Sequence, residues 1–130
     1  MQKITTTMMF TWVCLLGLEL SINGTQAYAQ DCKQPLSQSI FNQHKQQLKQ
    51  ESFEEDRMKM ATTFLQQKRC MKVSQIKTVI QMLNFEDNQL TFAKMAYKFA
   101  HDPENYQQVV AIFTEAPTRK TLTRYINKQK

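Results

Sequence analysis

Carboxylates are the first groups to consider for chemistry in this 130-residue sequence, since a pair of acids can catalyse hydrolysis. Seven of the eleven acids fall in the expected first turns of helices, where the helix dipole stabilises each negative charge by about 0.3–1 kcal/mol. They are Glu54, Glu55, Asp56, Glu86, Asp87, Asp102 and Glu104. This placement explains these acids without catalysis, so we expect no catalytic carboxylate pair.

The two histidines are fifty-seven residues apart, and neither has a metal-ligand partner at suitable spacing on its own expected helix. His44 lies on an apolar stripe, so we expect it to pack in the core. His101 is expected to interact with the negative end of a helix dipole. The serines carry no nucleophile signature. The sequence therefore predicts no catalytic residue, no metal and no cofactor, and a protein that is not an enzyme.

The only two glycines are Gly17 and Gly24, and the only tryptophan is Trp12. All three lie near the start of the chain, in a segment that we expect to be removed. Without glycine the remaining chain has no phosphate-binding loop, no dinucleotide fingerprint and no nucleophile elbow. These absences exclude many enzyme classes, and they disfavour tight β-hairpins.

The first 29 residues have the features of a signal peptide. Lys3 precedes the apolar run 8–18, which is too short to span a bilayer, and Ala27-Tyr28-Ala29 fits the small-x-small cleavage rule. No lipidation box is present. We therefore expect a signal peptide at 1–29, a single α-helical domain at 30–130 without a membrane span, and export to the periplasm or beyond. An uncleaved anchoring helix is the alternative.

Cleavage leaves two cysteines, Cys32 and Cys70. In an oxidising compartment an isolated pair of thiols most simply forms a structural disulfide. Closing a loop of about 39 residues stabilises a fold by about 4 kcal/mol in the chain-entropy treatment. The alternative is a reactive or metal-binding pair, although no further cysteine or well-spaced histidine lies near either residue in the sequence.

The apolar residues after position 35 follow helical spacing. Six short helices with joints of a few residues predict an all-α fold, a compact helical bundle. Ser52, Ser74, Asp102 and Thr118 are expected to cap helix starts. The residues that define the six helices are Leu36, Ile40, His44 and Leu48; Met58, Ala61 and Leu65 (about 53–68); Ile76, Val79, Ile80 and Leu83; Leu90, Phe92, Ala93 and Ala96 (about 86–100); Tyr106, Val109, Val110 and Phe113; and Leu122, Tyr125 and Ile126.

The chain also contains an internal repeat. The pattern that begins at Phe53-Glu54-Glu55 recurs thirty-two positions later at Phe85-Glu86-Asp87. Gln75-Ile76 matches Gln108-Val109 further on, one place out of register. We interpret this as a duplicated helical hairpin, with the first and last helices covering its two ends.

The stretch 84–97, followed by 102–106 and Val109, resembles a bacterial family catalogued as domain of unknown function 4476. The resemblance extends over nearly all of residues 30–130, but departs from the usual pattern at Met58 and Met60 and in a basic, glutamine-rich composition. It implies an exported helical domain, a kind often found at the end of longer envelope proteins. It implies no activity or cofactor. The motif residues are Phe85, Leu90, Ala93, Tyr97, Asp102, Asn105 and Tyr106.

Basic residues are in surplus, giving a formal net charge of +6 that is unchanged by removing 1–29. Some surround the joint between the second and third helices, and others lie in the last helix. Together they are the candidate patch for an anion or an acidic partner. Its residues are Lys68, Arg69, Lys72, Lys77, Arg119, Lys120, Arg124 and Lys128. The aromatic residues fall at core spacings, so nucleic-acid binding is not expected.

Three functional hypotheses follow. The first is an exported module that binds another protein at the bacterial envelope. The second is electrostatic attachment to an anionic polymer or surface through the basic last helix. The third is a secreted effector or small enzyme whose site the sequence does not reveal.

Overall fold

The structure, a computed structural model, describes residues 32–68 and 70–130, except for the side chain of Lys68. The expected signal peptide at 1–29 and Arg69 lie outside these residues. The regular elements described are helices: α1 (Gln38–Gln50), α2 (Glu54–Lys68), α3 (Val73–Met82), α4 (Glu86–Tyr97), the 3-10 helix η1 (Pro103–Asn105), α5 (Gln107–Val110) and α6 (Ala116–Asn127). The predicted all-α fold is confirmed: extended pairing in this part is limited to one isolated bridge between Met71 and Ala100.

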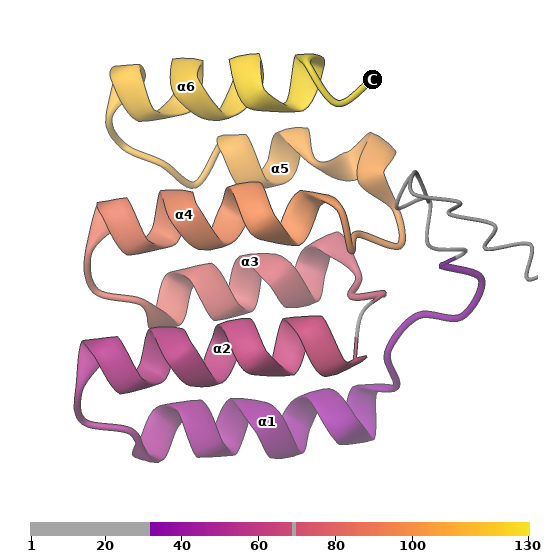
Figure 1. The fold of residues 1–130 in the computed structure, drawn as a ribbon, viewed down its shortest axis with the longest axis vertical. Coiled ribbons are helices and arrows are strands. Elements are labelled where there is room, and N and C mark those ends of the chain that lie inside the picture. The colour runs from indigo at the N-terminus through magenta and orange to yellow at the C-terminus, as the bar shows by residue number, and fades with distance from the viewer. Residues whose placement is uncertain (1–31, 69) are drawn as a thin grey trace, which may run out of the picture.

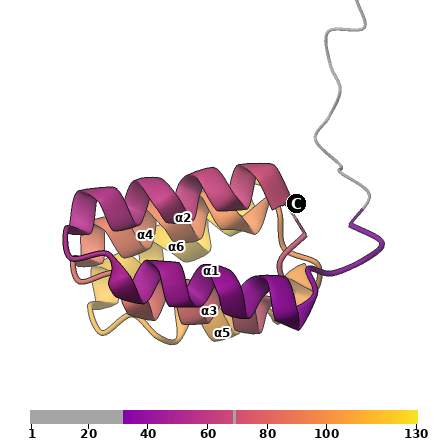
Figure 2. The same ribbon diagram turned by 90° about the horizontal axis from the view of Figure 1, so that it is seen from below.

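The helices form three antiparallel pairs stacked in two layers (Figure 1). Helices α1, α3 and α5 lie in one layer and α2, α4 and α6 in the other, as Figure 2 shows. Each helix contacts its partner in the pair and its neighbours within the layer. The predicted hairpin repeat is present, but its units are α1–α2, α3–α4 and α5–α6. Helices α1 and α6 therefore belong to hairpins and do not merely cover their ends. The result is three stacked hairpins, where the sequence predicted two with covering helices.

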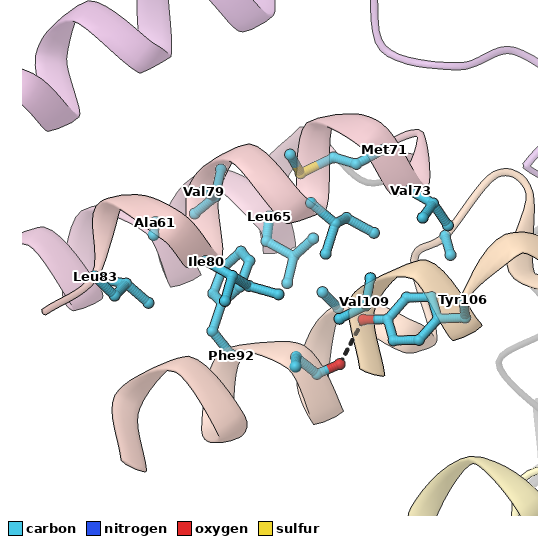
Figure 3. Close-up of a cluster of buried hydrophobic side chains, with 14 of the residues drawn as sticks. Ala61, Leu65, Met71, Val73, Val79, Ile80, Leu83, Phe92, Tyr106 and Val109 are labelled. Atoms are coloured by element: carbon cyan, nitrogen blue, oxygen red, sulfur yellow. Dashed lines mark hydrogen bonds between the residues drawn. The ribbon is translucent and has the colours of Figure 1, made fainter. Parts of the chain in front are cut away.

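The core lies between the two layers, where α3 and α4 each pack against three other helices. Half of the residues of helix α3 are buried, including Ile76 and Ile80. Helix α4 contributes Phe92 and the small residues Ala93 and Ala96, which let neighbouring helices approach closely. Figure 3 shows Ile80 and Phe92 gathered with Leu65 of α2 and Val109 of α5. Within the described residues, no helix is long and apolar enough to cross a membrane.

A repeated contact joins the two helices of each hairpin. The fourth residue of α2, α4 and α6 is Arg57, Gln89 and Arg119 respectively. Arg57 donates to the carbonyl of Leu48 in α1 at 3.3 Å, and Gln89 donates to that of Leu83 after α3 at 2.7 Å. Each side chain thus satisfies a carbonyl that the end of the preceding helix leaves free.

Arg119 makes the third contact of this kind, and donates to the carbonyls of Phe113 at 2.8 Å and Thr114 at 2.7 Å. The equivalent donors stand thirty-two and thirty residues apart, close to the period of the sequence repeat. This shared contact supports treating α5 and α6 as a third copy of the hairpin.

Three of the four predicted helix caps are wrong. Helix α2 begins at Glu54, two residues after Ser52, and Ser74 and Thr118 lie inside the first turns of α3 and α6. Asp102 does precede a helix, η1, but its carboxylate makes no cap there. Two helix starts are instead capped from elsewhere in the chain: Asp102 accepts from the backbone N–H of Val73 in α3 at 2.7 Å, and Glu54 caps α4. Carboxylates brought in by the tertiary fold replace the local caps.

Candidate functional site

Two phenylalanines are exposed at equivalent positions of the repeat. Phe53 precedes α2 and has 71% of its surface exposed, and Phe85 precedes α4 with 62% exposed. The α1–α2 and α3–α4 joints that carry them lie on the same side of the stack, at the left in Figure 1. We name this surface the aromatic edge; it comprises Phe53, Phe85 and the exposed acids Glu55, Asp56 and Asp87.

A largely buried ion pair fixes the backbone of the aromatic edge. Glu54 and Arg57 are 3.2 Å apart, and their side chains are 10% and 13% exposed. The second carboxylate oxygen of Glu54 accepts hydrogen bonds from the backbone N–H groups of Asn84 at 2.9 Å and Phe85 at 3.4 Å. Since Glu54 follows Phe53 directly, this contact holds the two phenylalanine backbones side by side.

Arg57 completes the connection on its other side. Besides the Leu48 carbonyl, it donates to the carbonyl of Met82 at 3.2 Å and to the carbonyl of Glu51. One guanidinium group therefore ties the ends of α1 and α3 to the start of α2. The five-donor geometry of arginine suits this task, and lysine could not reproduce it. The aromatic edge is thus a fixed surface formed by two neighbouring hairpins.

The acids lie where the sequence predicted. Glu54, Glu55 and Asp56 occupy the first turn of α2, and Glu86 and Asp87 that of α4. Glu104 lies in η1, after Asp102. Because the starts of α2 and α4 are neighbours, the exposed acids Glu55, Asp56 and Asp87 give the aromatic edge negative charge beside its exposed rings. Such a surface can bind a partner that offers both apolar and basic groups.

The candidate basic patch is divided by the fold. Lys72 precedes α3 and Lys77 lies within it, in the middle of the stack, whereas α6 lies at one end (Figure 1). Lys120 and Arg124 on α6, and Lys128 just after it, are exposed next to a surface hollow of about 560 Å³ that Val110 and Thr123 also line. Arg119 is committed to two carbonyls, as described above. The side chain of Lys68 and the whole of Arg69 lie outside the described residues.

Five of the seven family motif residues lie at or near the joint between α4 and α5, whereas Phe85 precedes α4 and Leu90 lies within it. The five are Ala93, Tyr97, Asp102, Asn105 and Tyr106. The Tyr106 hydroxyl donates to the carbonyl of Ala93 at 2.6 Å (Figure 3). Its ring meets that of Tyr97 edge to face at 5.0 Å, and burial raises the pKa of Tyr106 well above its ordinary value. Asp102 also accepts from the side-chain amide of Asn105 at 3.1 Å. These contacts stabilise the fold, as does Leu90, which packs against the core.

His44 is buried, as predicted. Its ring stacks on Phe64 with centroids 3.6 Å apart and planes nearly parallel. Burial lowers the pKa of His44 to about 4, although a hydrogen bond with Gln47 opposes the shift. The ring is therefore neutral at physiological pH. Its burial and its stacking on Phe64 make it a core residue.

The cysteines form the predicted disulfide, with the Cα atoms of Cys32 and Cys70 5.1 Å apart. The fold also brings His101, which is distant in the sequence, next to them. Nδ1 of His101 is 2.7 Å from the carbonyl oxygen of Cys32 and 3.9 Å from Sγ of Cys70. Sequence spacing could not reveal this contact, because His101 is 31 residues from Cys70 and 69 from Cys32.

No curated protein and no solved structure matches the chain. The family model described as domain of unknown function, DUF4476, matches residues 35–126, which include α1 to α5, α6 up to Ile126, and the joint between α4 and α5. The match spans well over half of the sequence and agrees with the motif and the fold. The chain therefore belongs to the DUF4476 family.

Proposed function

We propose that this protein is an exported binding module that recognises another protein through the aromatic edge. The observation that carries the proposal is the pair of phenylalanines, 71% and 62% exposed, at equivalent places on adjacent hairpins. Exposed aromatic rings cost solubility, whereas aromatic residues are enriched at binding interfaces. The Glu54–Arg57 pair holds their backbones in place before binding, which lowers the entropy lost on association.

The charge around the rings indicates the class of partner. Glu55, Asp56 and Asp87 are exposed beside Phe53 and Phe85. A protein segment with apolar side chains flanked by lysine or arginine complements this surface. The apolar contacts supply most of the affinity, so salt should weaken binding only modestly. We propose binding and not catalysis as the activity, and the bacterial envelope or the surrounding medium as its place.

Export is supported by two features. The segment 1–29 has the charge, apolar run and cleavage pattern of a signal peptide. The Cys32–Cys70 disulfide is of a kind that persists in oxidising compartments. Mass spectrometry of the processed chain from the envelope or the culture medium tests this part, with Gln30 as the expected first residue.

Photo-crosslinking tests the aromatic edge. A photoreactive phenylalanine analogue at position 53 or 85 should give the same protein adduct from an envelope extract. The analogue at position 40 provides the control, because Ile40 is an apolar residue with 40% exposure on α1. A Phe53→Ser, Phe85→Ser double variant should keep its helical content and lose the partner, while Ile40→Ser keeps it. Retention of the partner by the double variant would overturn the proposal.

The basic face of α6 supports a second candidate function, attachment to an anionic surface or polymer. Lys120, Arg124 and Lys128 are exposed together beside the 560 Å³ hollow, whose lining residues include no acid. Their attraction to anions should fall steeply with salt. Binding to vesicles that contain anionic lipid should vanish in a Lys120→Gln, Arg124→Gln, Lys128→Gln variant. Binding that is unchanged between low and high salt would exclude this function.

A further inference from the structure

Three chain segments meet at the opposite end of the helices from the aromatic edge (Figure 1). The backbone N–H of Leu36 donates to the carbonyl of Cys70 at 2.9 Å, which ties the segment before α1 to the α2–α3 joint. The N–H of Met71 donates to Phe99 at 2.9 Å, and that of His101 donates to Met71 at 2.8 Å. These bonds tie the same joint to the segment after α4. The junction is therefore held by the main chain as well as by the disulfide.

Three side chains with metal-binding atoms converge at this junction. Sγ of Cys32, Sγ of Cys70 and a ring nitrogen of His101 all lie within 4.8 Å of one another, and all three residues are partly buried. Nδ1 of His101 lies 3.9 Å from Sγ of Cys70. The same nitrogen lies 2.7 Å from the carbonyl oxygen of Cys32, which orients the ring toward the sulfurs. Cys70 has a left-handed backbone with φ of 59°, which turns the chain between α2 and α3.

Two thiolates and one imidazole are ligands that Zn²⁺ prefers in proteins. A site with three protein ligands leaves a fourth position of the zinc tetrahedron open to water or to another ligand. In the disulfide the two sulfurs are bonded to each other and cannot act as thiolates. Opening that bond would release both ligands at a place where the backbone bonds of Leu36, Met71 and His101 keep them close to the imidazole.

We propose that the dithiol form of this protein binds one Zn²⁺ through Cys32, Cys70 and His101. A dithiol reductant transfers two electrons and two protons to the Cys32–Cys70 bond and is itself oxidised to a disulfide. The two free thiols then lose their protons as their sulfurs bind the metal. Nδ1 of His101 exchanges its hydrogen bond to the Cys32 carbonyl for a bond to zinc, and Nε2 carries the ring proton. The disulfide and the metal are thus alternative ties between the same three segments.

Cobalt spectroscopy tests the site, because Co²⁺ bound tetrahedrally to thiolates absorbs strongly in the visible and near ultraviolet. The purified protein is reduced with a phosphine, and the phosphine is removed under anaerobic conditions. The reduced protein is then titrated first with Co²⁺ and then with Zn²⁺. One Co²⁺ per chain should bind with a thiolate charge-transfer band, and one Zn²⁺ should displace it. The oxidised protein and a Cys32→Ser, Cys70→Ser variant should show no such band. Equal binding by the reduced protein and that variant would overturn the proposal.

A His101→Asn variant tests whether the imidazole is a zinc ligand, since asparagine can still donate to the Cys32 carbonyl but offers no imidazole nitrogen. Its affinity for Zn²⁺ should be lower by about tenfold or more, because loss of a direct ligand costs at least as much as loss of an outer contact. Unchanged affinity would refute the role of His101. Alkylation of the reduced wild-type protein gives a second measurement that needs no variant: Zn²⁺ should slow modification of both cysteines. Protection of neither or of only one would also refute the site.

Discussion

Replacing Arg57 by methionine is expected to destabilise the fold by about 3 kcal/mol. The substitution keeps an apolar stem but removes the donors to the carbonyls of Leu48, Glu51 and Met82 and the partner of Glu54. Hydrogen bonds to charged groups contribute about 1.5–3 kcal/mol each, and removing one member of a buried ion pair costs about 3–5 kcal/mol. Because both side chains keep some exposure to water, 13% and 10%, we take the lower part of that range.

For a domain of this size each kcal/mol lowers the melting temperature by about 4–8 °C, so the expected decrease is about 12–24 °C. Urea unfolding followed by circular dichroism measures the free energy directly. Lys59→Met is the matched control, since Lys59 is an exposed cation on the same helix and its loss should change stability by less than about 0.5 kcal/mol. Glu54→Gln completes a double-mutant cycle, with an expected coupling to Arg57 of about 0.5–3 kcal/mol. A loss below about 1 kcal/mol for Arg57→Met would refute our account of how the aromatic edge is held.

Three further predictions concern the core and the disulfide. Because burial lowers the pKa of His44 to about 4, the unfolded chain takes up a proton from about pH 6.5 downward while the folded chain does not. The free energy of unfolding should therefore be highest above pH 6.5 and fall by about 1–2 kcal/mol, allowing for solvent screening, as the pH drops toward 4. In urea titrations, His44→Leu should remove this part of the decrease. An unchanged pH dependence in that variant would contradict the prediction. Tyr106→Phe leaves the Ala93 carbonyl without its donor and should cost about 1–2 kcal/mol in the same assay, whereas no loss would mean that water replaces the hydroxyl. A Cys32→Ser, Cys70→Ser double variant should lose about 2–4 kcal/mol of unfolding free energy. It should retain the helical circular dichroism signal, because the backbone hydrogen bonds between the three segments remain. Collapse of the helical signal would show that the disulfide alone holds these segments together.

Sequence patterns predicted the helices because each buries an apolar stripe, and such stripes depend on local spacing. Ile76, Val79 and Ile80 place α3 correctly for this reason, and the repeat from Phe53 to Phe85 predicted neighbouring equivalent helices. Helix α5 is shorter than its apolar spacing suggested: it spans Gln107–Val110 after a 3-10 turn that begins at Pro103. Proline at the first turn leaves no N–H to donate there, and a short 3-10 turn tolerates this.

Several side-chain contacts of the structure were not predicted. Arg119 was assigned to the candidate anion patch, and in the structure it donates to the carbonyls of Phe113 and Thr114, between α5 and α6. A signal for this was available, since Arg119 occupies the same place in α6 as Arg57 does in α2. Glu54 was expected only to favour its own helix dipole, yet it caps α4 thirty residues away. The contact of His101 with the disulfide had no signal in the sequence, because it depends on how three joints pack together.

The donor at the fourth residue of every second helix has a consequence for how such chains can vary in length. Within each hairpin the same kind of side-chain-to-carbonyl contact holds the second helix against the first. Each hairpin therefore adds one helix to each of the two layers. In a stack of this kind each hairpin contacts only its neighbours, so gain or loss of a whole hairpin is tolerated better than a change of a few residues. Relatives that differ by multiples of about thirty residues are the size variants that this architecture permits.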